Sequence, residues 1–201
     1  MKIIVASKNA HKVKELSEML ALADIELVSL RDMGFEGEIE ENGSTFEENA
    51  LIKARAACAA YRLPALADDS GLCVDALGGE PGIYSARYAS ADGENADDAA
   101  NVEKLLSKLT DVPDQQRTGR FICAIALALP DGTETVVSGA CEGVITREIH
   151  GDGGFGYDPV FFYEPYGKTF GETSDKEKNA VSHRAAAVRL IKAELLRMIN
   201  V

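Results

Sequence analysis

The stretch "FICAIALAL", Phe121 to Leu129, decides the fold class because it is a continuous apolar run. A strand with one solvated face alternates apolar and polar residues, so an uninterrupted run predicts a strand that is covered on both faces. The chain then turns at Asp131-Gly132, and "TETVVSGACEGVI", Thr133 to Ile145, predicts a long partner strand. Strands covered on both faces are typical of α/β proteins, in which helices pack on either side of the sheet.

The rest of the chain supplies helices and further strands at the expected spacing. Apolar residues recur with helical period in four segments, and the second of these opens with Ser44 and Glu47 in the spacing of a capping box. The predicted helices cover residues 10–20, 44–60, 96–109 and 182–199, and further strands cover 2–6, 25–30 and 64–77, the last interrupted by a polar turn. We therefore expect an α/β fold in which a long, bent mixed β-sheet with flanking helices forms two lobes of a single domain, residues 1–201.

Composition and charge exclude several functional classes. The 201 residues carry a formal net charge of −12, which argues against broad binding to nucleic acid or membrane surfaces. No stretch approaches the ~20 apolar residues that a membrane span needs, and the first residues lack the zones of a signal peptide, so a cytoplasmic location is expected. The four cysteines show no C-x-x-C spacing and are expected to be buried free thiols.

Two helix starts carry basic side chains, where the helix dipole disfavours them. In "SKNAHK", Ser7 to Lys12, Asn9 is suited to cap the helix, and the lysines around it suggest that an anion binds to the first turn. A capped surface helix explains this stretch about as well as a phosphate site does. Lys178 and Arg184 likewise suggest that an anion binds at the predicted start of the last helix, where Ser182 and His183 also lie.

Adjacent carboxylates form the second candidate site. Asp68 and Asp69 precede Ser70-Gly71, and two neighbouring carboxylates either raise a pKa or require a cation. Magnesium prefers such oxygen ligands, and an acidic loop with Glu38, Glu40 and Glu41 could supply another. An ordinary Asp-Asp-Ser-Gly turn and a solvated acidic loop are the alternatives.

The glycine-rich stretch "HGDGGFGYDP", residues 150–159, contains the spacing G-x-G-x-x-G. A dinucleotide fingerprint must lead from a strand into a helix, whereas Pro159 prevents Asp158 from continuing a helix. We therefore interpret the stretch as a loop that binds a base, with Phe155 and Tyr157 available for stacking and Asp158 for hydrogen bonds.

Taken together, these segments resemble one family along nearly the whole chain, the inosine triphosphate pyrophosphatase family, also called XTP/dITP diphosphatases. The family's S/T-x-N-x-x-K motif is matched by Ser7, Asn9 and Lys12. The further motifs follow in the family's order: "TFEENALIKA", "LADDSGL", "GGEPGIYSARY", "GGFGYDPVF" and "SHR".

The resemblance implies a house-cleaning enzyme that hydrolyses ITP, dITP and XTP to the monophosphate and pyrophosphate with Mg²⁺, as a homodimer with its substrate cleft between two lobes. It implies that Asp69 binds metal and accepts the proton, with Glu40 as the other metal ligand, although Glu41 is its neighbour and the register of that loop is open. The residues implied to bind substrate are Ser7, Lys8, Asn9, Ala10, His11 and Lys12 for the triphosphate, Ser70, and, for base and sugar, Phe155, Gly156, Tyr157, Asp158, Lys178, His183 and Arg184. Position 8 departs from the family, which commonly has a small residue there.

Two other functions were weighed against this one. A Maf-type pyrophosphatase for modified pyrimidine nucleotides is disfavoured by the "GGFGYD" and "SHR" segments. A sensor that binds purine nucleotides without turnover would be marked by loss of the Asp-Asp pair, and Asp68 and Asp69 are both present.

Overall fold

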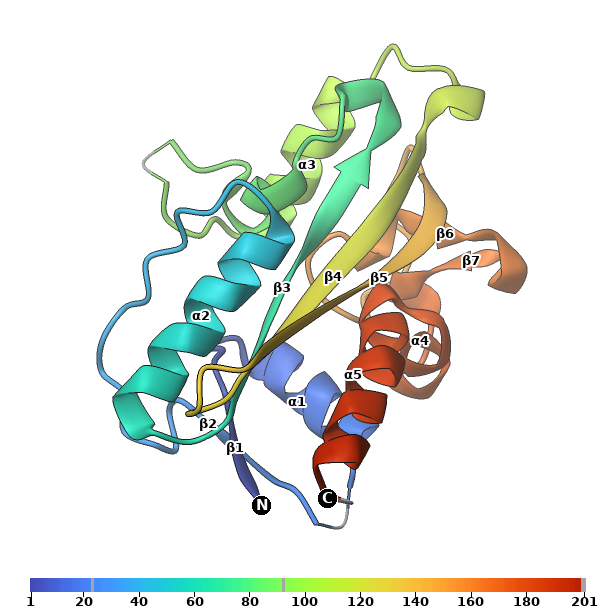
Figure 1. Cartoon of the computed structure of the whole chain (residues 1–201). Coiled ribbons are helices and arrows are strands. Elements are labelled where there is room, and N and C mark those ends of the chain that lie inside the picture. Colours follow the sequence, from blue (N-terminus) through green and yellow to red (C-terminus); the bar gives the residue numbers. More distant parts are fainter. Residues whose placement is uncertain (23, 92, 200–201) are drawn as a thin grey trace. The chain divides into compact units, whose positions relative to one another are not determined.

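The computed structural model describes residues 1–22, 24–91 and 93–199. These described residues form seven strands in one mixed sheet and five α-helices (Figure 1). The sheet order is β2-β1-β3-β4-β5-β6-β7. The strands are β1 (Lys2–Val5), β2 (Glu26–Ser29), β3 (Ala65–Val74), β4 (Thr118–Ala128), β5 (Glu134–Ile145), β6 (Phe161–Tyr163) and β7 (Lys168–Thr169). The helices are α1 (Ala10–Leu20), α2 (Phe46–Tyr61), α3 (Asp98–Lys108), α4 (Asp175–Val181) and α5 (His183–Ile199).

The sheet is mixed, as the sequence predicted. β1 pairs in parallel with β2 and with β3, whereas β6 pairs antiparallel with both β5 and β7. The first parallel pair is the strand-turn-helix unit at the start of the chain, because α1 carries the chain from β1 to β2 and a parallel partner requires such a crossover. The predicted mixed α/β fold is confirmed.

The chain divides into two compact units, and β3, β4 and β5 each contribute residues to both. Unit 1 comprises Met1–Asp69, Cys123–Gly139 and His183–Val201, and unit 2 comprises Ser70–Ile122 and Ala140–Ser182. Each unit has a hydrophobic cluster of its own.

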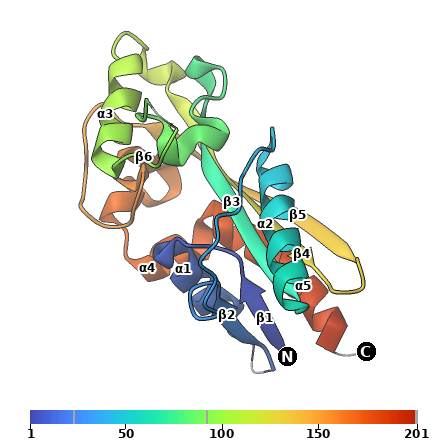
Figure 2. The ribbon, with the colours of Figure 1, turned by 90° about the vertical axis from the view of Figure 1, so that its left-hand side faces the viewer.

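In unit 1, the strands carry large side chains on one face and alanines on the other. Alternation along each strand places these sets on opposite faces. Helices α1 and α5 lie side by side over the large side chains, and Figures 1 and 2 show α2 along the other face. The first face packs Leu16, Leu20, Ile191 and Leu195 against Ile3, Val5, Leu66 and Ile125. Ala65, Ala67, Ala124 and Ala126 of the other face are buried, as are Ala50, Ala54 and Ala57 of α2.

In unit 2, aromatic residues dominate the core. Phe121, Phe161 and Phe170 contact one another, with the Phe121 and Phe161 ring centroids 4.6 Å apart. Gly143 allows this packing, because a Cβ there would lie 2.5 Å from the Phe161 ring. The segment that joins β3 to α3 contains a 3₁₀ turn, Gly82–Arg87.

Three local predictions need correction. The second helix is capped by Thr45, whose side chain accepts a hydrogen bond from the Glu48 N–H at 3.1 Å, so it begins one residue later than the Ser44 capping box implied. The predicted helix 182–199 is confirmed as α5, but a further short helix, α4, precedes it, and the extended backbone of Ser182 separates the two. Lys178 therefore lies within α4 rather than at the start of the last helix. The polar turn predicted within strand 64–77 is absent, since β3 runs unbroken from Ala65 to Val74.

Cys58, Cys123 and Cys141 are buried free thiols as predicted, whereas Cys73 is free but only partly buried. Among the described residues, no helix is both long enough and apolar enough to span a membrane.

Candidate active site

The two neighbouring aspartates lie inside β3, and their side chains point to opposite faces of the strand. Asp68 meets residues of α1 and α5, whereas Asp69 meets a residue of α2. This alternation explains why no polar turn interrupts the strand, because each carboxylate finds cations in its own layer. The sequence suggested two carboxylates acting on one ion, but the strand geometry gives them separate partners.

Asp68 is the centre of a buried charge cluster in unit 1. Its Oδ1 lies 2.8 Å from Lys12 Nζ, and its Oδ2 accepts from Arg184 Nε at 3.2 Å and from the Cys123 thiol at 2.9 Å. Arg184 also pairs with Glu15 of α1. Burial by itself would raise the pKa of Asp68, but attraction to Arg184 and Lys12 outweighs burial and holds that pKa well below its usual range. Asp68 is therefore ionised throughout the physiological range and fixes Lys12 in place.

The start of α1 has the geometry of an anion-binding helix terminus. Asn9 is the N-cap, and its Oδ1 accepts from the Lys12 N–H at 3.1 Å, as predicted. The Ser7 hydroxyl accepts from the Asn9 N–H at 3.2 Å. The first turn of a helix presents N–H groups that have no carbonyl partner within the helix, and its dipole favours negative charge. Lys8, Asn9, Ala10 and His11 are exposed there, so an anion could reach them.

The two lysines of this turn differ in their surroundings. Lys8 is exposed, and its Nζ lies 3.8 Å from Oε1 of the exposed Glu38; an exposed ion pair of this kind contributes little to stability. Lys12 is largely buried against Asp68. The sequence predicted the same role in anion binding for both lysines, but of the two only Lys12 is held by a buried partner.

Asp69 belongs to a second cluster on the α2 face of unit 1. Its Oδ1 accepts from Lys53 Nζ at 3.0 Å, and the same Nζ donates to Glu41 Oε2 at 2.7 Å. Burial raises the pKa of Asp69, and the attraction of Lys53 and Lys12 offsets part of this rise. A buried carboxylate with a raised pKa is a stronger base than an exposed one.

Of the two glutamates left open by the sequence, Glu41 lies in this cluster. Its side chain is partly buried against Lys53, whereas Glu40 is exposed. The reason is local, because the Gly43 N–H donates to Asn49 Oδ1 at 2.8 Å and Ser44 bonds to Glu48, which hold the end of the acidic loop against α2.

The donor set fits a divalent cation that arrives with its substrate. No three acidic, histidine or cysteine side chains converge as a metal cage anywhere in the described part of the chain. Mg²⁺ is commonly bound by one or two carboxylates together with substrate phosphates and water. Asp69 and Glu41, which converge on one ammonium group, offer such a pair.

In unit 2, Asp158 and Lys178 form a buried ion pair beneath Phe155. Asp158 Oδ2 accepts from Lys178 Nζ at 2.7 Å and from the Phe155 N–H at 2.8 Å. Lys178 Nζ also lies 4.3 Å from the centroid of the Phe155 ring, within the range of a cation–π interaction. Gly154 has φ +72°, and a Cβ there would lie 2.2 Å from Asp158 Oδ2. The glycine-rich loop is thus shaped around the Asp158 carboxylate, and Phe155 is left partly exposed.

The neighbouring predicted residues have structural partners. Tyr157 is buried in the unit 2 core, and its hydroxyl donates to the Ser85 carbonyl at 2.8 Å. The prediction that its ring stacks on a base is therefore wrong. The Gly156 N–H donates to Asp98 Oδ2 at 2.6 Å. Ser70 follows Asp69 directly in β3 and is partly buried.

The first residues of α5 are buried in unit 1. His183 is 4% exposed, and the Arg184 side chain is enclosed by Asp68 and Glu15. Arg184 thus lies with Lys12 in the Asp68 cluster, where its buried guanidinium balances the charges of Asp68 and Glu15.

The structure therefore brings the predicted residues together in three groups, each of which lies within one unit. The first is the Asp68 cluster with the α1 start, and the second is Asp69 with Lys53 and Glu41. The third, in unit 2, is Asp158 with Lys178 and Phe155.

Sequence reasoning missed Lys53, Glu15 and Cys123. A signal for Lys53 was present, because it falls on the buried face of α2 in register with Phe46, Asn49, Ala50, Ala54 and Ala57. A lysine at such a position requires a buried anion. The partners of Glu15 and Cys123 come from distant parts of the chain and left no local pattern.

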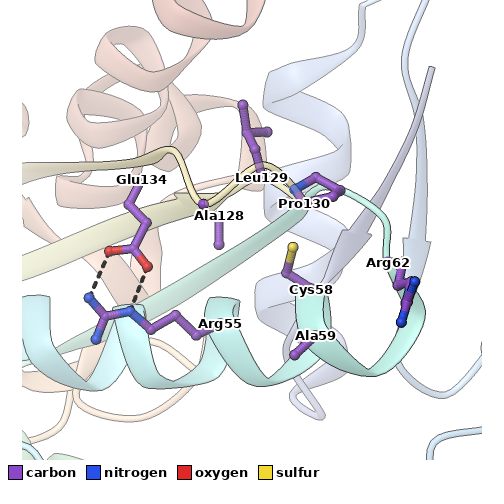
Figure 3. Close-up of a pocket in the computed structure, with 9 residues that line it drawn as sticks. Arg55, Cys58, Ala59, Arg62, Ala128, Leu129, Pro130 and Glu134 are labelled. Carbon is purple, nitrogen blue, oxygen red and sulfur yellow. Dashed lines mark hydrogen bonds and ion pairs between the residues drawn. The ribbon is translucent and has the colours of Figure 1, made fainter.

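A concave region of about 480 Å³ lies elsewhere on unit 1, between α2 and the turn that joins β4 to β5 (Figure 3). At its edge, Arg55 and Glu134 form a bidentate ion pair, in which Nε donates to Oε1 at 2.6 Å and Nη2 donates to Oε2 at 2.7 Å. None of the residues that line it is a predicted site residue. We place the candidate active site at the charge clusters instead.

Comparisons with known proteins agree in pointing to one group of enzymes. The sequence profile of the Ham1 family matches residues 3–194. The chain is 50% identical to the dITP/XTP pyrophosphatase of Geobacillus kaustophilus, over 92% of this chain and 90% of that protein. It is also 50% identical to the dITP/XTP pyrophosphatase of Shigella flexneri, over 94% of this chain and 95% of that protein. The solved structure of a HAM1 protein from Coxiella burnetii superposes with a TM-score of 0.88 at 41% identity and covers 98% of this chain and 99% of that chain.

Proposed function

The chain belongs to the Ham1 family, and we propose that it is a hydrolase that converts non-canonical purine nucleoside triphosphates (ITP, dITP and XTP) to the monophosphate and pyrophosphate. The resemblance to the inosine triphosphate pyrophosphatase family is thereby confirmed. The chemistry rests on one observation: the two neighbouring carboxylates of β3 pair with different cations. Asp68 pairs with Lys12 and fixes its position, whereas Asp69 lies beside Lys53 and is the proposed base.

The triphosphate binds at the start of α1. Ser7 to Lys12 offer backbone N–H groups, a hydroxyl, an amide and two lysines, and the helix dipole adds a further positive field. Lys12 is held by Asp68 at 2.8 Å, so its ammonium group is already in place before substrate binds. Pre-positioned cations stabilise the charge that develops on the leaving pyrophosphate.

Asp69 accepts the proton of the attacking water. As the water oxygen bonds to the α-phosphorus, the bond from that phosphorus to the bridging oxygen breaks, and pyrophosphate leaves. A base in this position contributes roughly 10²- to 10⁴-fold to the rate. The raised pKa of Asp69, caused by burial, strengthens it as a proton acceptor. Ser70, the next residue of β3, contacts the substrate.

Asp69 and Glu41 hold Mg²⁺, and Glu41 replaces Glu40 in this role because its side chain lies at the cluster. When bound, the metal ion neutralises phosphate charge and polarises the phosphoryl oxygens. Lys53 lies between these two carboxylates.

Phe155 stacks on the base, supported from beneath by the Asp158–Lys178 pair. Tyr157 and Gly156 hold this loop in shape through their own bonds to unit 2. Arg184 acts through Asp68 rather than by touching the substrate. A site that donates hydrogen bonds to a purine 6-oxo group accepts inosine and xanthosine, whereas the 6-amino group of adenine would face another donor.

The test is an assay of pyrophosphate release from ITP, XTP, dITP, GTP and ATP, with and without Mg²⁺. We expect ITP, dITP and XTP to be cleaved at least about tenfold more efficiently than ATP, a difference that one unsatisfied hydrogen bond can supply. Equal cleavage of the five nucleotides would refute the substrate assignment, and undiminished cleavage after chelation would refute the metal requirement.

The same assay decides between this function and its alternatives. A Maf-type enzyme would cleave modified pyrimidine nucleotides instead, and a nucleotide sensor would bind ITP without releasing pyrophosphate. A homodimeric enzyme in the cytoplasm is the state we propose, and sedimentation of the purified protein at a monomer mass would refute the dimer.

A further inference from the structure

Lys53 has an unusual position between the two proposed metal ligands of unit 1. Its ammonium nitrogen lies 2.7 Å from Glu41 Oε2 and 3.0 Å from Asp69 Oδ1. The side chains of Lys53 and Asp69 are 10% and 12% exposed, so both charges are largely removed from water. One nitrogen therefore makes two charge-assisted hydrogen bonds that are weakly screened by solvent.

Lys53 cannot give up both bonds together without a replacement partner. A buried ammonium group that loses its anionic partners is strongly destabilising, because its desolvation is no longer offset. The two carboxylates within hydrogen-bond distance keep the Lys53 ammonium group charged. Withdrawal of both carboxylates would leave an unpaired cation inside unit 1.

A metal ion bound by Asp69 and Glu41 requires the same carboxylate oxygens. The three charges of the cluster sum to −1 with Lys53 in place and to −2 without it. A divalent cation next to a charged Lys53 also experiences direct repulsion. Metal binding to the free protein is thus opposed by Lys53 both through competition for ligands and through charge.

Lys12 does not play this part, because it is engaged on the other face of β3. Its Nζ lies 2.8 Å from the fully buried Asp68, which is also bound by Arg184. Of Lys12 and Lys53, only Lys53 bridges the proposed metal ligands.

We propose that Lys53 occupies the cation position between Glu41 and Asp69 in the nucleotide-free protein, and that a divalent cation binds well only when a triphosphate gives Lys53 a new anionic partner. Metal and nucleotide then bind with positive coupling, and the free protein does not hold the metal on its own. This inference rests on the proposed function, since it takes Asp69 and Glu41 as the metal ligands.

The test measures Mn²⁺ affinity in the absence of nucleotide, by electron paramagnetic resonance of the free ion, with Mn²⁺ as the probe for a divalent cation. We expect weak binding by the wild-type protein and at least about tenfold tighter binding by Lys53→Met, which removes the competing charge. Lys14→Met is the matched control, because it makes the same charge change at an exposed residue of α1 and should leave the affinity at the wild-type value. Glu41→Gln in the Lys53→Met background should abolish the gain.

Equal Mn²⁺ affinity of the wild type and Lys53→Met would overturn the proposal, as would micromolar binding by the wild type alone. Lys53→Gln provides a second, polar replacement if Lys53→Met does not fold, and circular dichroism checks the fold of each variant. None of these titrations contains nucleotide, so their failure is distinct from failure of the substrate assay.

Discussion

Replacing Asp68 with asparagine should lower the free energy of unfolding by about 3–5 kcal/mol, the usual cost of removing one partner of a buried ion pair. Asparagine has nearly the same shape as aspartate, so the change removes a charge without opening a cavity. It leaves Arg184, which is fully buried, with Glu15 as its acidic partner, and it releases Lys12. For a chain of 201 residues, such a loss corresponds to a decrease in Tm of about 6 to 20 °C.

Asp69→Asn is the matched control, because it makes the same chemical change one residue along the same strand. Its effect on stability should be much smaller, since burial raises the pKa of Asp69 and Lys53 keeps Glu41 as a partner. Calorimetric Tm values of the two variants should therefore differ by several degrees. Equal losses of stability would refute the claim that the two carboxylates occupy different electrostatic environments.

The pH dependence provides a second check on Asp68. Its pKa in the folded protein lies well below the unfolded value of about 3.9, so its contribution to stability is fully present above pH ~4 and is lost as the pH falls through the folded pKa. The difference in stability between the wild type and Asp68→Asn should accordingly be constant from pH 5 to 8 and shrink on acidification below ~4. A difference that grows on acidification would contradict the assigned charge state.

Three further outcomes are expected. Asp69→Asn should reduce the rate of pyrophosphate release from ITP by about 10²-fold or more while ITP binding is retained, and a full rate would exclude Asp69 as the base. Lys178→Met should raise the KM for ITP more than it lowers kcat, because it removes the cation that pairs with Asp158 beneath Phe155; an unchanged KM, measured in the same assay, would separate this pair from base binding. Gly139→Ala should lower the stability to urea by about 1–3 kcal/mol, because the added Cβ would lie 2.4 Å from the Ala187 nitrogen of α5, and an unaltered midpoint would show that α5 can shift freely.

Much of the secondary structure could be predicted because its causes are local. The apolar run from Phe121, the Asn9 cap and the helical period of α1 each depend on residues a few positions apart, and the structure agrees with them. Helix α4 was not predicted, because its seven residues carry no apolar stripe of helical period, whereas the start of α5 agrees with the prediction.

The candidate site was predicted as a set of residue types but not as an arrangement. Tyr157 shows the limit, since an aromatic residue in a glycine-rich loop can stack on a ligand or fill a core, and only its contact with the Ser85 carbonyl in unit 2 decides for the core. Glu40 and Glu41 show it again, because a shift of one residue in an acidic loop leaves no trace in composition.

The sequence alone determined the α/β class, the strand-turn-helix at the amino-terminal end, and the presence of an Asp-Asp pair and of basic residues around Asn9. These features follow from periodicity and from the chemistry of single residues. Only the tertiary structure decided which charge meets which, because the alternation of side chains along β3 sends Asp68 to Lys12 and Arg184 and Asp69 to Lys53. The partners come from helices far apart in the chain, and burial between layers, which local sequence does not record, gives the two side chains different electrostatic environments.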